Sequence, residues 1–308
     1  MSGRLAILCP GQGAQHAGMF NVLGMAAAPA LLAGWRLDEA LGMPLVQLVH
    51  DERRMFANRH AQPLLVAATL AAWEVVRPLL PRPTVVAGYS IGELSAHAVA
   101  GTITPSTALM LAALRAEAMD RCIQGQPPQG LVAVSGLRLE TIRALLPDAL
   151  YPAIETGDDA MIVGGRRDAI ARFEAAVLQA GGRGVVLPVE VASHTPLMQG
   201  AVAPFLAALQ ETQFQPAPSR LLAGISAAPV ANADQARDTL ARQLTQTIRW
   251  TDCMDACAEA GIAAALELGP GSGLARMFQA RHPDIPCRSL ADFRTPDGVS
   301  AWLERQGV

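Results

Sequence analysis

Short apolar runs bounded by glycine and proline alternate along the chain with longer stretches of helical periodicity. A run of roughly four to eight apolar residues is typical of a buried strand, whereas apolar positions recurring every three or four residues indicate a helix. This alternation predicts an α/β fold with a largely parallel sheet. The predicted strands are Arg4–Cys9, Thr84–Gly88, Arg220–Gly224 and Ala263–Leu268. The predicted helices are Ala61–Leu79, Ile91–Ala100, Pro105–Cys122, Pro196–Leu209 and Asp234–Gln243.

The pattern changes after the breaker cluster Gln124–Pro128. The units that follow are shorter and have the order strand, helix, two strands, helix and strand, which is that of a ferredoxin-like module. They are predicted at Leu131–Ser135, Leu139–Leu146, Tyr151–Glu155, Met161–Val163, Asp168–Ala180 and Gly184–Pro188. We therefore expect a small ferredoxin-like α+β subdomain at residues 127–190. It would be inserted in a large α/β domain made of residues 1–126 and 191–308.

The composition excludes several classes of function. The chain of 308 residues is 51% hydrophobic and can bury a substantial core. Its formal net charge is -3 and its basic residues are dispersed, so we expect no nucleic-acid partner. All 24 basic residues are arginine, which excludes chemistry that needs a lysine amine, such as a pyridoxal Schiff base or a P-loop. His16 stands where a dinucleotide fingerprint starting at Gly11 would need its third glycine.

The most apolar stretches, Ala61–Leu80 and Ala96–Ala116, are interrupted by charged residues or by glycine and proline. We therefore expect buried helices and no membrane span. The run Leu5–Cys9 is too short for a signal-peptide core, so a cytoplasmic protein is expected. The five cysteines are scattered and predicted to be reduced. Cys253 and Cys257 have helical spacing but no neighbouring histidine or second cysteine pair, so no metal site is expected.

Residues 85–94 have the pattern of a serine nucleophile elbow: an apolar strand, a Gly-x-Ser-x-Gly pentapeptide and the start of a helix. Glycines on either side let the chain turn sharply, so that the Ser90 hydroxyl projects above the sheet at a helix N-terminus. Free backbone amides there, that of Ile91 foremost, can stabilise an oxyanion. Such a pentapeptide also arises by chance, and the alternative is a glycine-rich turn in which Ser90 is only an N-cap.

His194 is the best placed of the six histidines to act as a general base. His97 follows Ser90 by seven positions on one predicted helix, so a rise of about 10 Å puts it out of reach. His194 lies where an apolar run ends and Pro196 opens a helix, a loop position of the kind where catalytic groups gather. The alternative is a loop histidine that only caps or packs.

Arg115 lies on an apolar stripe of its predicted helix. Its neighbours at helical spacing are Ala108, Leu111, Ala112, Ala118, Met119 and Cys122. A buried guanidinium needs an anion, and its planar fork fits a carboxylate, so a substrate with a free carboxylate is predicted. The alternative is a structural ion pair with an internal Asp or Glu. Glu117 and Arg121 lie on another face at i,i+4 and are expected to form a solvated pair.

The chain resembles the malonyl-CoA:acyl carrier protein transacylase family along nearly its whole length. The matching motifs are Pro10–Gln15, the elbow Gly88–Glu93, Ser193-His194, Arg242–Leu244, Arg249-Trp250 and Glu267–Gly271, with Arg115 in the matching helix. The resemblance implies an α/β core with an inserted ferredoxin-like subdomain. It also implies a Ser90–His194 dyad without a carboxylate, in which the backbone carbonyl of Gln243 orients the imidazole. The amides of Gln12 and Ile91 would form the oxyanion hole.

The same resemblance implies an S-malonyltransferase with no bound cofactor. Malonyl-CoA would acylate Ser90, and the phosphopantetheine-type thiol of an acyl carrier protein would take the malonyl group. Tyr89 departs from the histidine that is common before the nucleophile, and Glu155-Thr156-Gly157 from a usual Asn-containing stretch. With a tyrosine at this position, the chain resembles the malonyl transferase (epsilon) subunit associated with malonate decarboxylase. The acceptor is therefore open between a fatty-acid carrier, the decarboxylase carrier subunit and a polyketide carrier.

Two alternative functions are also compatible with a serine nucleophile elbow. A serine hydrolase or thioesterase would place its histidine late in the chain, where His282 lies in a charged turn expected to be exposed. A catalytically idle scaffold subunit would keep the fold and only bind a partner. Retention of Ser90, His194 and Arg115 together argues against the scaffold.

Overall fold

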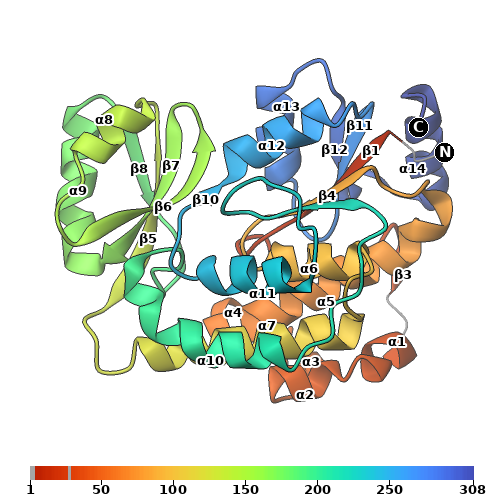
Figure 1. Cartoon of the computed structure of the whole chain (residues 1–308), viewed down its shortest axis with the longest axis horizontal. Coiled ribbons are helices and arrows are strands. Elements are labelled where there is room, and N and C mark those ends of the chain that lie inside the picture. The colour runs from red at the N-terminus through yellow and green to blue at the C-terminus, as the bar shows by residue number, and fades with distance from the viewer. Residues whose placement is uncertain (1–3, 27–28) are drawn as a thin grey trace.

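The computed structural model describes residues 4–26 and 29–308. Its main sheet has five parallel strands in the order β12-β11-β1-β4-β9 (Figure 1). They are β1 (Leu5–Cys9), β4 (Val85–Gly88), β9 (Arg220–Leu222), β11 (Ala264–Glu267) and β12 (Cys287–Ser289). The predicted parallel-sheet α/β core is confirmed, and the four predicted strands are present with shifted ends. Strand β12, with an arginine at its centre, was not predicted.

Helices cover both faces of the main sheet. Along β1, Leu5 and Ile7 belong to the apolar core on one face, while Ala6 and Leu8 belong to the core on the other. The first face carries α5 (Asn58–Val76), α6 (Gly92–Val99), α7 (Pro105–Cys122), η2 (Pro196–Met198), α10 (Gln199–Gln210) and α11 (Ala233–Arg242). Helix α5 continues into the short 3-10 helix η1 (Arg77–Leu79), which has no buried residue. The second carries α12 (Trp250–Glu259) and α13 (Gly273–Arg281). Helix α7 has the predicted bounds, and the other predicted helices differ only near their ends.

Helices α12 and α13 were not predicted. The other unpredicted elements are β2 (Asn21–Val22), β3 (Met25–Ala26), α1 (Pro29–Gly34), α2 (Leu37–Leu41), α3 (Leu45–Leu48), α4 (Glu52–Phe56), η3 (Leu290–Asp292) and α14 (Pro296–Arg305). Strands β2 and β3 form an antiparallel pair. Within the described ranges, no helix combines the length and the hydrophobicity needed to cross a membrane.

A second sheet lies at the other end of the molecule (Figure 1). Its order is β10-β6-β7-β5-β8, formed by β5 (Gln129–Ser135), β6 (Leu150–Gly157), β7 (Ala160–Arg166), β8 (Arg183–Val186) and β10 (Ile248–Arg249). With α8 (Leu139–Ala144) and α9 (Arg167–Gln179) it has the predicted ferredoxin-like order and antiparallel pairing. Strand β10 comes from later in the chain and pairs parallel to β6. The domain boundaries at residues 127 and 190 stay a prediction.

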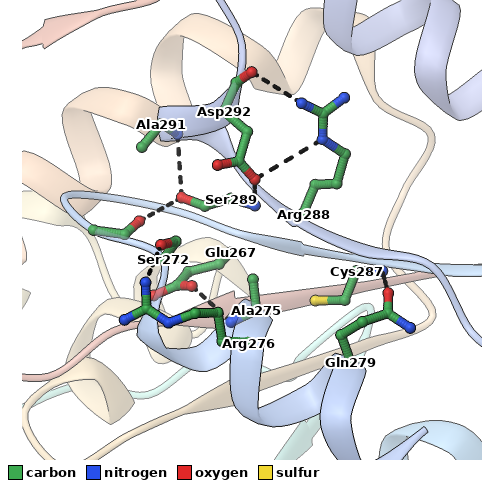
Figure 2. Close-up of polar contacts among 11 residues, drawn as sticks. Glu267, Ser272, Ala275, Arg276, Gln279, Cys287, Arg288, Ser289, Ala291 and Asp292 are labelled. Carbon is green, nitrogen blue, oxygen red and sulfur yellow. Dashed lines mark hydrogen bonds and ion pairs between the residues drawn. The ribbon is translucent and has the colours of Figure 1, made fainter. Parts of the chain in front are cut away.

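The motif Glu267–Gly271 joins β11 to α13 (Figure 2). The buried Glu267 carboxylate accepts a hydrogen bond of 2.7 Å from the Ala275 amide, so it caps the first turn of α13. Burial raises the pKa of Glu267 to about 7, although this capping bond lowers it. The Ser289 hydroxyl donates to the Gly271 carbonyl. These contacts fasten the C-terminal motif to the sheet.

Candidate active site

Ser90 occupies a tight turn between β4 and α6. Its φ is +57°, a left-handed conformation that costs a non-glycine residue on the order of 1–3 kcal/mol. A Cβ on Gly92 would lie 2.2 Å from the Cys9 carbonyl oxygen. A Cβ on Gly88 would lie 2.3 Å from the Glu93 Cα. The turn closes only because both flanking residues are glycine, and the predicted elbow is present.

The Ser90 hydroxyl lies next to the imidazole of His194. Ser90 Oγ and His194 Nε2 are 2.7 Å apart, and His194 Nδ1 is 2.6 Å from the Gln243 carbonyl oxygen. A carbonyl only accepts, so Nδ1 carries the proton and Nε2 accepts from the serine hydroxyl. The His194 backbone, at φ +63°, also donates its amide to the Leu244 carbonyl at 2.9 Å. The segment after α11 therefore holds the histidine by both its ring and its backbone.

The environment of His194 favours the neutral imidazole. Burial lowers the pKa of His194 to about 3, and the positive charge of Arg115 acts in the same direction. The hydrogen bond to the Gln243 carbonyl opposes both effects. His194 is therefore uncharged at neutral pH and able to take a proton from Ser90.

Arg115 is buried on α7, as its helical neighbours predicted, with a side chain that reaches two amides. It donates to Gln62 Oε1 at 2.7 Å and to Gln243 Oε1 at 3.1 Å. In the described part of the chain, no Asp or Glu oxygen lies within the 4.0 Å of a salt bridge to Arg115, although the nearby Glu93 carboxyl group acts on it electrostatically. Burial lowers the pKa of Arg115 to about 10, and the charge of Glu93 opposes that shift. The guanidinium thus keeps its charge without a contacting anion.

The loop after β1 lies against the elbow. The Tyr89 amide donates to the Cys9 carbonyl at 2.9 Å, and a Cβ on Gly11 would lie 2.9 Å from the Tyr89 carbonyl oxygen. The loop therefore brings Gln12 beside the turn. Across residues 4–26 and 29–308, the backbone amides of Gln12 and Ile91 donate to no protein group. The assignment of these two amides to an oxyanion hole stays a prediction.

The two departures from the family pattern lie beside different elements. The Tyr89 ring packs edge-on against Trp250 of α12, with centroids 5.3 Å apart and an interplanar angle of 82°. Glu155 forms an ion pair with Arg143 within the second sheet's layer. Neither side chain takes part in the hydrogen bonds of Ser90 or His194 described above.

The other sequence candidates lie away from Ser90. His97 is buried and bonds Thr102 Oγ1 at 2.8 Å. His282, at the end of α13, is half-buried and not exposed as expected, with Nε2 3.0 Å from Asp255. Glu117 and Arg121 form the expected exposed pair. Among the described residues, no three His, Cys, Asp or Glu side chains are grouped as metal ligands.

Sequence reasoning missed three polar residues around Arg115. Gln62 and Glu93 are buried, at 0% and 1% exposure, and Asn58 begins α5. Gln62 bonds Arg115, and Asn58 and Glu93 bond the amides that face it. The available signal was a polar residue flanked on both sides by apolar residues or glycine: Gln62 between Ala61 and Pro63 in α5, and Glu93 between Gly92 and Leu94 in α6.

The acyl transferase domain family matches residues 7–287. The chain belongs to this family. This acyltransferase is 31% identical over 290 residues to the malonyl CoA-acyl carrier protein transacylase of Mycobacterium bovis, covering 93% of the chain and 96% of the relative. It is 29% identical over 315 residues to the transacylase of that name from Escherichia coli K12, covering 98% and 99%. The resemblance stated from the motifs is therefore confirmed.

Three solved transacylase structures superpose on this acyltransferase over nearly its whole length. The malonyl CoA-acyl carrier protein transacylase of Coxiella burnetii superposes with a TM-score of 0.89 at 25% identity, covering 99% of this chain and 98% of that one. The MCAT of Mycobacterium tuberculosis gives 0.87 at 31% identity, covering 99% of each. A malonyl-transacylase solved with its type II polyketide acyl-carrier protein gives 0.88 at 26% identity, covering 98% and 99%.

Proposed function

We propose that this acyltransferase moves a malonyl group from malonyl-CoA, through an ester on Ser90, to the thiol of an acyl carrier protein. The observation that carries the proposal is the environment of Arg115. Among residues 4–26 and 29–308, its buried guanidinium donates to two side-chain amides and to no carboxylate, and it lies in the network that also holds the Ser90–His194 pair. A carboxylate at the far end of the acyl group would provide the missing anion. The relatives from Mycobacterium bovis and Escherichia coli are malonyl CoA-acyl carrier protein transacylases, which supports the same substrate.

In the first half-reaction, Ser90 Oγ attacks the thioester carbonyl of malonyl-CoA while His194 Nε2 takes the hydroxyl proton. The Gln12 and Ile91 amides donate to the oxyanion, and such a donor is worth roughly 10²–10³ in rate. The carbon–sulfur bond then breaks, and the proton on His194 passes to the sulfur of the departing CoA thiolate. Ser90 is left as a malonyl ester.

In the second half-reaction, the carrier's phosphopantetheine thiol gives its proton to His194 and its sulfur attacks the ester carbonyl. The ester bond breaks, and the serine oxygen recovers the proton from His194. The paired malonyl carboxylate would offset the charge of Arg115, which is one of the causes that lower the pKa of His194. Binding of a diacid thioester would therefore make the base stronger, whereas an acetyl group would not.

Intact-protein mass after brief exposure to malonyl-CoA tests the ester. The wild type is expected to gain one malonyl group, Ser90→Ala none, and Ser226→Ala, a substitution at an exposed serine, the same gain as wild type. A gain by Ser90→Ala would reject Ser90 as the acyl carrier, and no gain by wild type would favour the scaffold. Release of free malonate without any carrier would favour the hydrolase.

The acceptor is tested by adding purified carriers to the malonyl-enzyme. We expect loss of the enzyme-bound malonyl group and its gain by a phosphopantetheinylated acyl carrier protein, but not by the same carrier without its prosthetic arm. Tyr89 makes the malonate decarboxylase carrier subunit the second carrier to assay. Exclusive transfer to that subunit would replace the acyl carrier protein in the proposal.

A further inference from the structure

Arg115 is held by two chains of amide hydrogen bonds, each ending in a carboxylate. On one side, Gln243 accepts from Arg115 through Oε1 and donates through Nε2 to Glu93. On the other, Gln62 accepts from Arg115 through Oε1 and donates through Nε2 to Asn58 Oδ1 at 2.7 Å. Asn58 Nδ2 in turn donates to Asp120 Oδ1 at 2.7 Å. Neither carboxylate reaches the guanidinium itself.

The carboxylates decide which way the amides face. A side-chain amide has an oxygen that accepts and a nitrogen that donates, and a half-turn exchanges them. Burial raises the pKa of Glu93 to about 7, and its ionised form only accepts, so it binds the nitrogen end of Gln243 and leaves the amide oxygen facing Arg115. With the amide reversed, two donors would face each other inside the protein, where unpaired polar groups are costly.

This arrangement fixes the position of the charged Arg115 guanidinium through hydrogen bonds to neutral amides, without a direct contact to a carboxylate. A direct carboxylate neighbour would compete with a substrate carboxylate for the same fork. The amide oxygens hold the guanidinium through neutral acceptors, and the carboxyl groups of Glu93 and Asp120 lie further along the two chains of hydrogen bonds. Gln243 Nε2 also donates to the Ser90 carbonyl at 3.3 Å, so the same amide lies between the anion site and the elbow.

We propose that Glu93 and Asn58 are positioning residues for substrate selectivity, which orient the amides of Gln243 and Gln62 so that Arg115 can accept the carboxylate of the acyl group. The inference rests on the proposed malonyl transfer. It assigns the Gln243 side chain a role separate from its backbone carbonyl, which bonds His194. Within the described residues no hydrogen bond joins Glu93 to Arg115, so apart from the electrostatic effect of its charge Glu93 acts on Arg115 through Gln243.

Two substitutions at Glu93 distinguish its role as a hydrogen-bond acceptor from the role of its negative charge. In Glu93→Gln the new amide oxygen can stand where Oε2 now accepts from Gly224 N, at 3.1 Å, and from Gln243. Glu93→Leu has similar bulk and no acceptor. The readout is the ratio of kcat/KM for malonyl-CoA to kcat/KM for acetyl-CoA. We expect Glu93→Gln to stay near the wild-type ratio and Glu93→Leu to lose about tenfold, mainly through the KM for malonyl-CoA.

The hydrogen bonds that run from Arg115 through Gln62 to Asn58 provide an independent test if Glu93→Leu fails to fold. Asn58→Ala removes the acceptor for Gln62 at a half-buried helix start and is expected to lower the same ratio. Asp120→Ala is the milder control, because Asn58 Nδ2 also donates to the Ala116 carbonyl at 3.2 Å and so stays oriented. Melting temperatures measured alongside identify loss of fold.

The outcomes distinguish failure of the positioning role of Glu93 and Asn58 from failure of the proposed malonyl transfer. A residue that only supports the fold would lower activity toward both thioesters alike, so an unchanged ratio in both Glu93→Leu and Asn58→Ala overturns the positioning role. A Glu93→Gln variant as unselective as Glu93→Leu would also overturn it, because charge rather than amide orientation would then be responsible. If wild type shows no preference for malonyl-CoA, the proposed function itself has failed.

Discussion

Replacing Arg115 by alanine should cost the enzyme its use of malonyl-CoA while sparing acetyl-CoA. The guanidinium can donate two hydrogen bonds to a carboxylate, and a bond to a charged group contributes about 1.5–3 kcal/mol. Two such bonds correspond to about 3–6 kcal/mol. At 1.36 kcal/mol per factor of ten, the expected loss in kcat/KM for malonyl-CoA is roughly 10²–10⁴-fold.

The same substitution affects stability, because Gln62 Oε1 and Gln243 Oε1 lose their donor. An unsatisfied buried acceptor costs about 1–3 kcal/mol, so a lower melting temperature is expected and must be measured beside the kinetics. Arg121→Ala is the matched control. It lies on the same helix, its side chain is 68% exposed, and its surface pair with Glu117 is expected to contribute little.

The assay is acyl transfer to a carrier thiol from malonyl-CoA and acetyl-CoA, each at several concentrations. The ratio of the two kcat/KM values cancels any loss of active protein. A ratio in Arg115→Ala equal to that of Arg121→Ala and wild type would refute the assignment of Arg115 to the substrate carboxylate.

Two further predictions follow from the geometry of the elbow and the dyad. Gly92→Ala would place its Cβ 2.2 Å from the Cys9 carbonyl oxygen, so we expect a lower melting temperature and at least about a hundredfold slower acylation of Ser90 by mass. Gly273→Ala, whose Cβ meets no atom within 4 Å, is the control, and equal behaviour would contradict this view of the turn. His194 has its pKa lowered to about 3, so the unprotonated base persists as pH falls. Initial-rate kcat/KM should therefore change little from His194 between pH 7 and 5, whereas an imidazole with a pKa of about 6.5 would lose about 20-fold; such a loss would show an ordinary histidine.

The features that the sequence predicted well are those determined by neighbours along the chain. The elbow needs a strand, two glycines and a helix in succession, and the burial of Arg115 follows from the residues three and four positions away on α7. The position of His194 was also apparent from its place between an apolar run and Pro196. Its contact with Ser90, 104 positions away, does not follow from the local pattern and was implied only by the family resemblance.

The polar network around Arg115 escaped prediction because its bonds join distant segments. Gln62 and Arg115 are 53 positions apart, and Glu93 and Gln243 are 150 apart. Helical periodicity says which face of a helix is buried but not which polar group from another element meets it. Strands β10 and β12 were missed for a related reason: they are two and three residues long, each includes an arginine, and only pairing with a neighbouring strand defines them.

Strand β10 has a mechanical consequence for the dyad. It pairs with β6 in the second sheet and begins at Ile248, five positions after Gln243, whose carbonyl bonds the imidazole. Leu244, which accepts from the His194 amide, lies within the same short tether. A rotation of the second sheet relative to the first would displace the segment between Gln243 and Ile248, which orients the His194 imidazole. A fixed arrangement of the two sheets is therefore required to keep the imidazole within hydrogen-bond distance of Ser90.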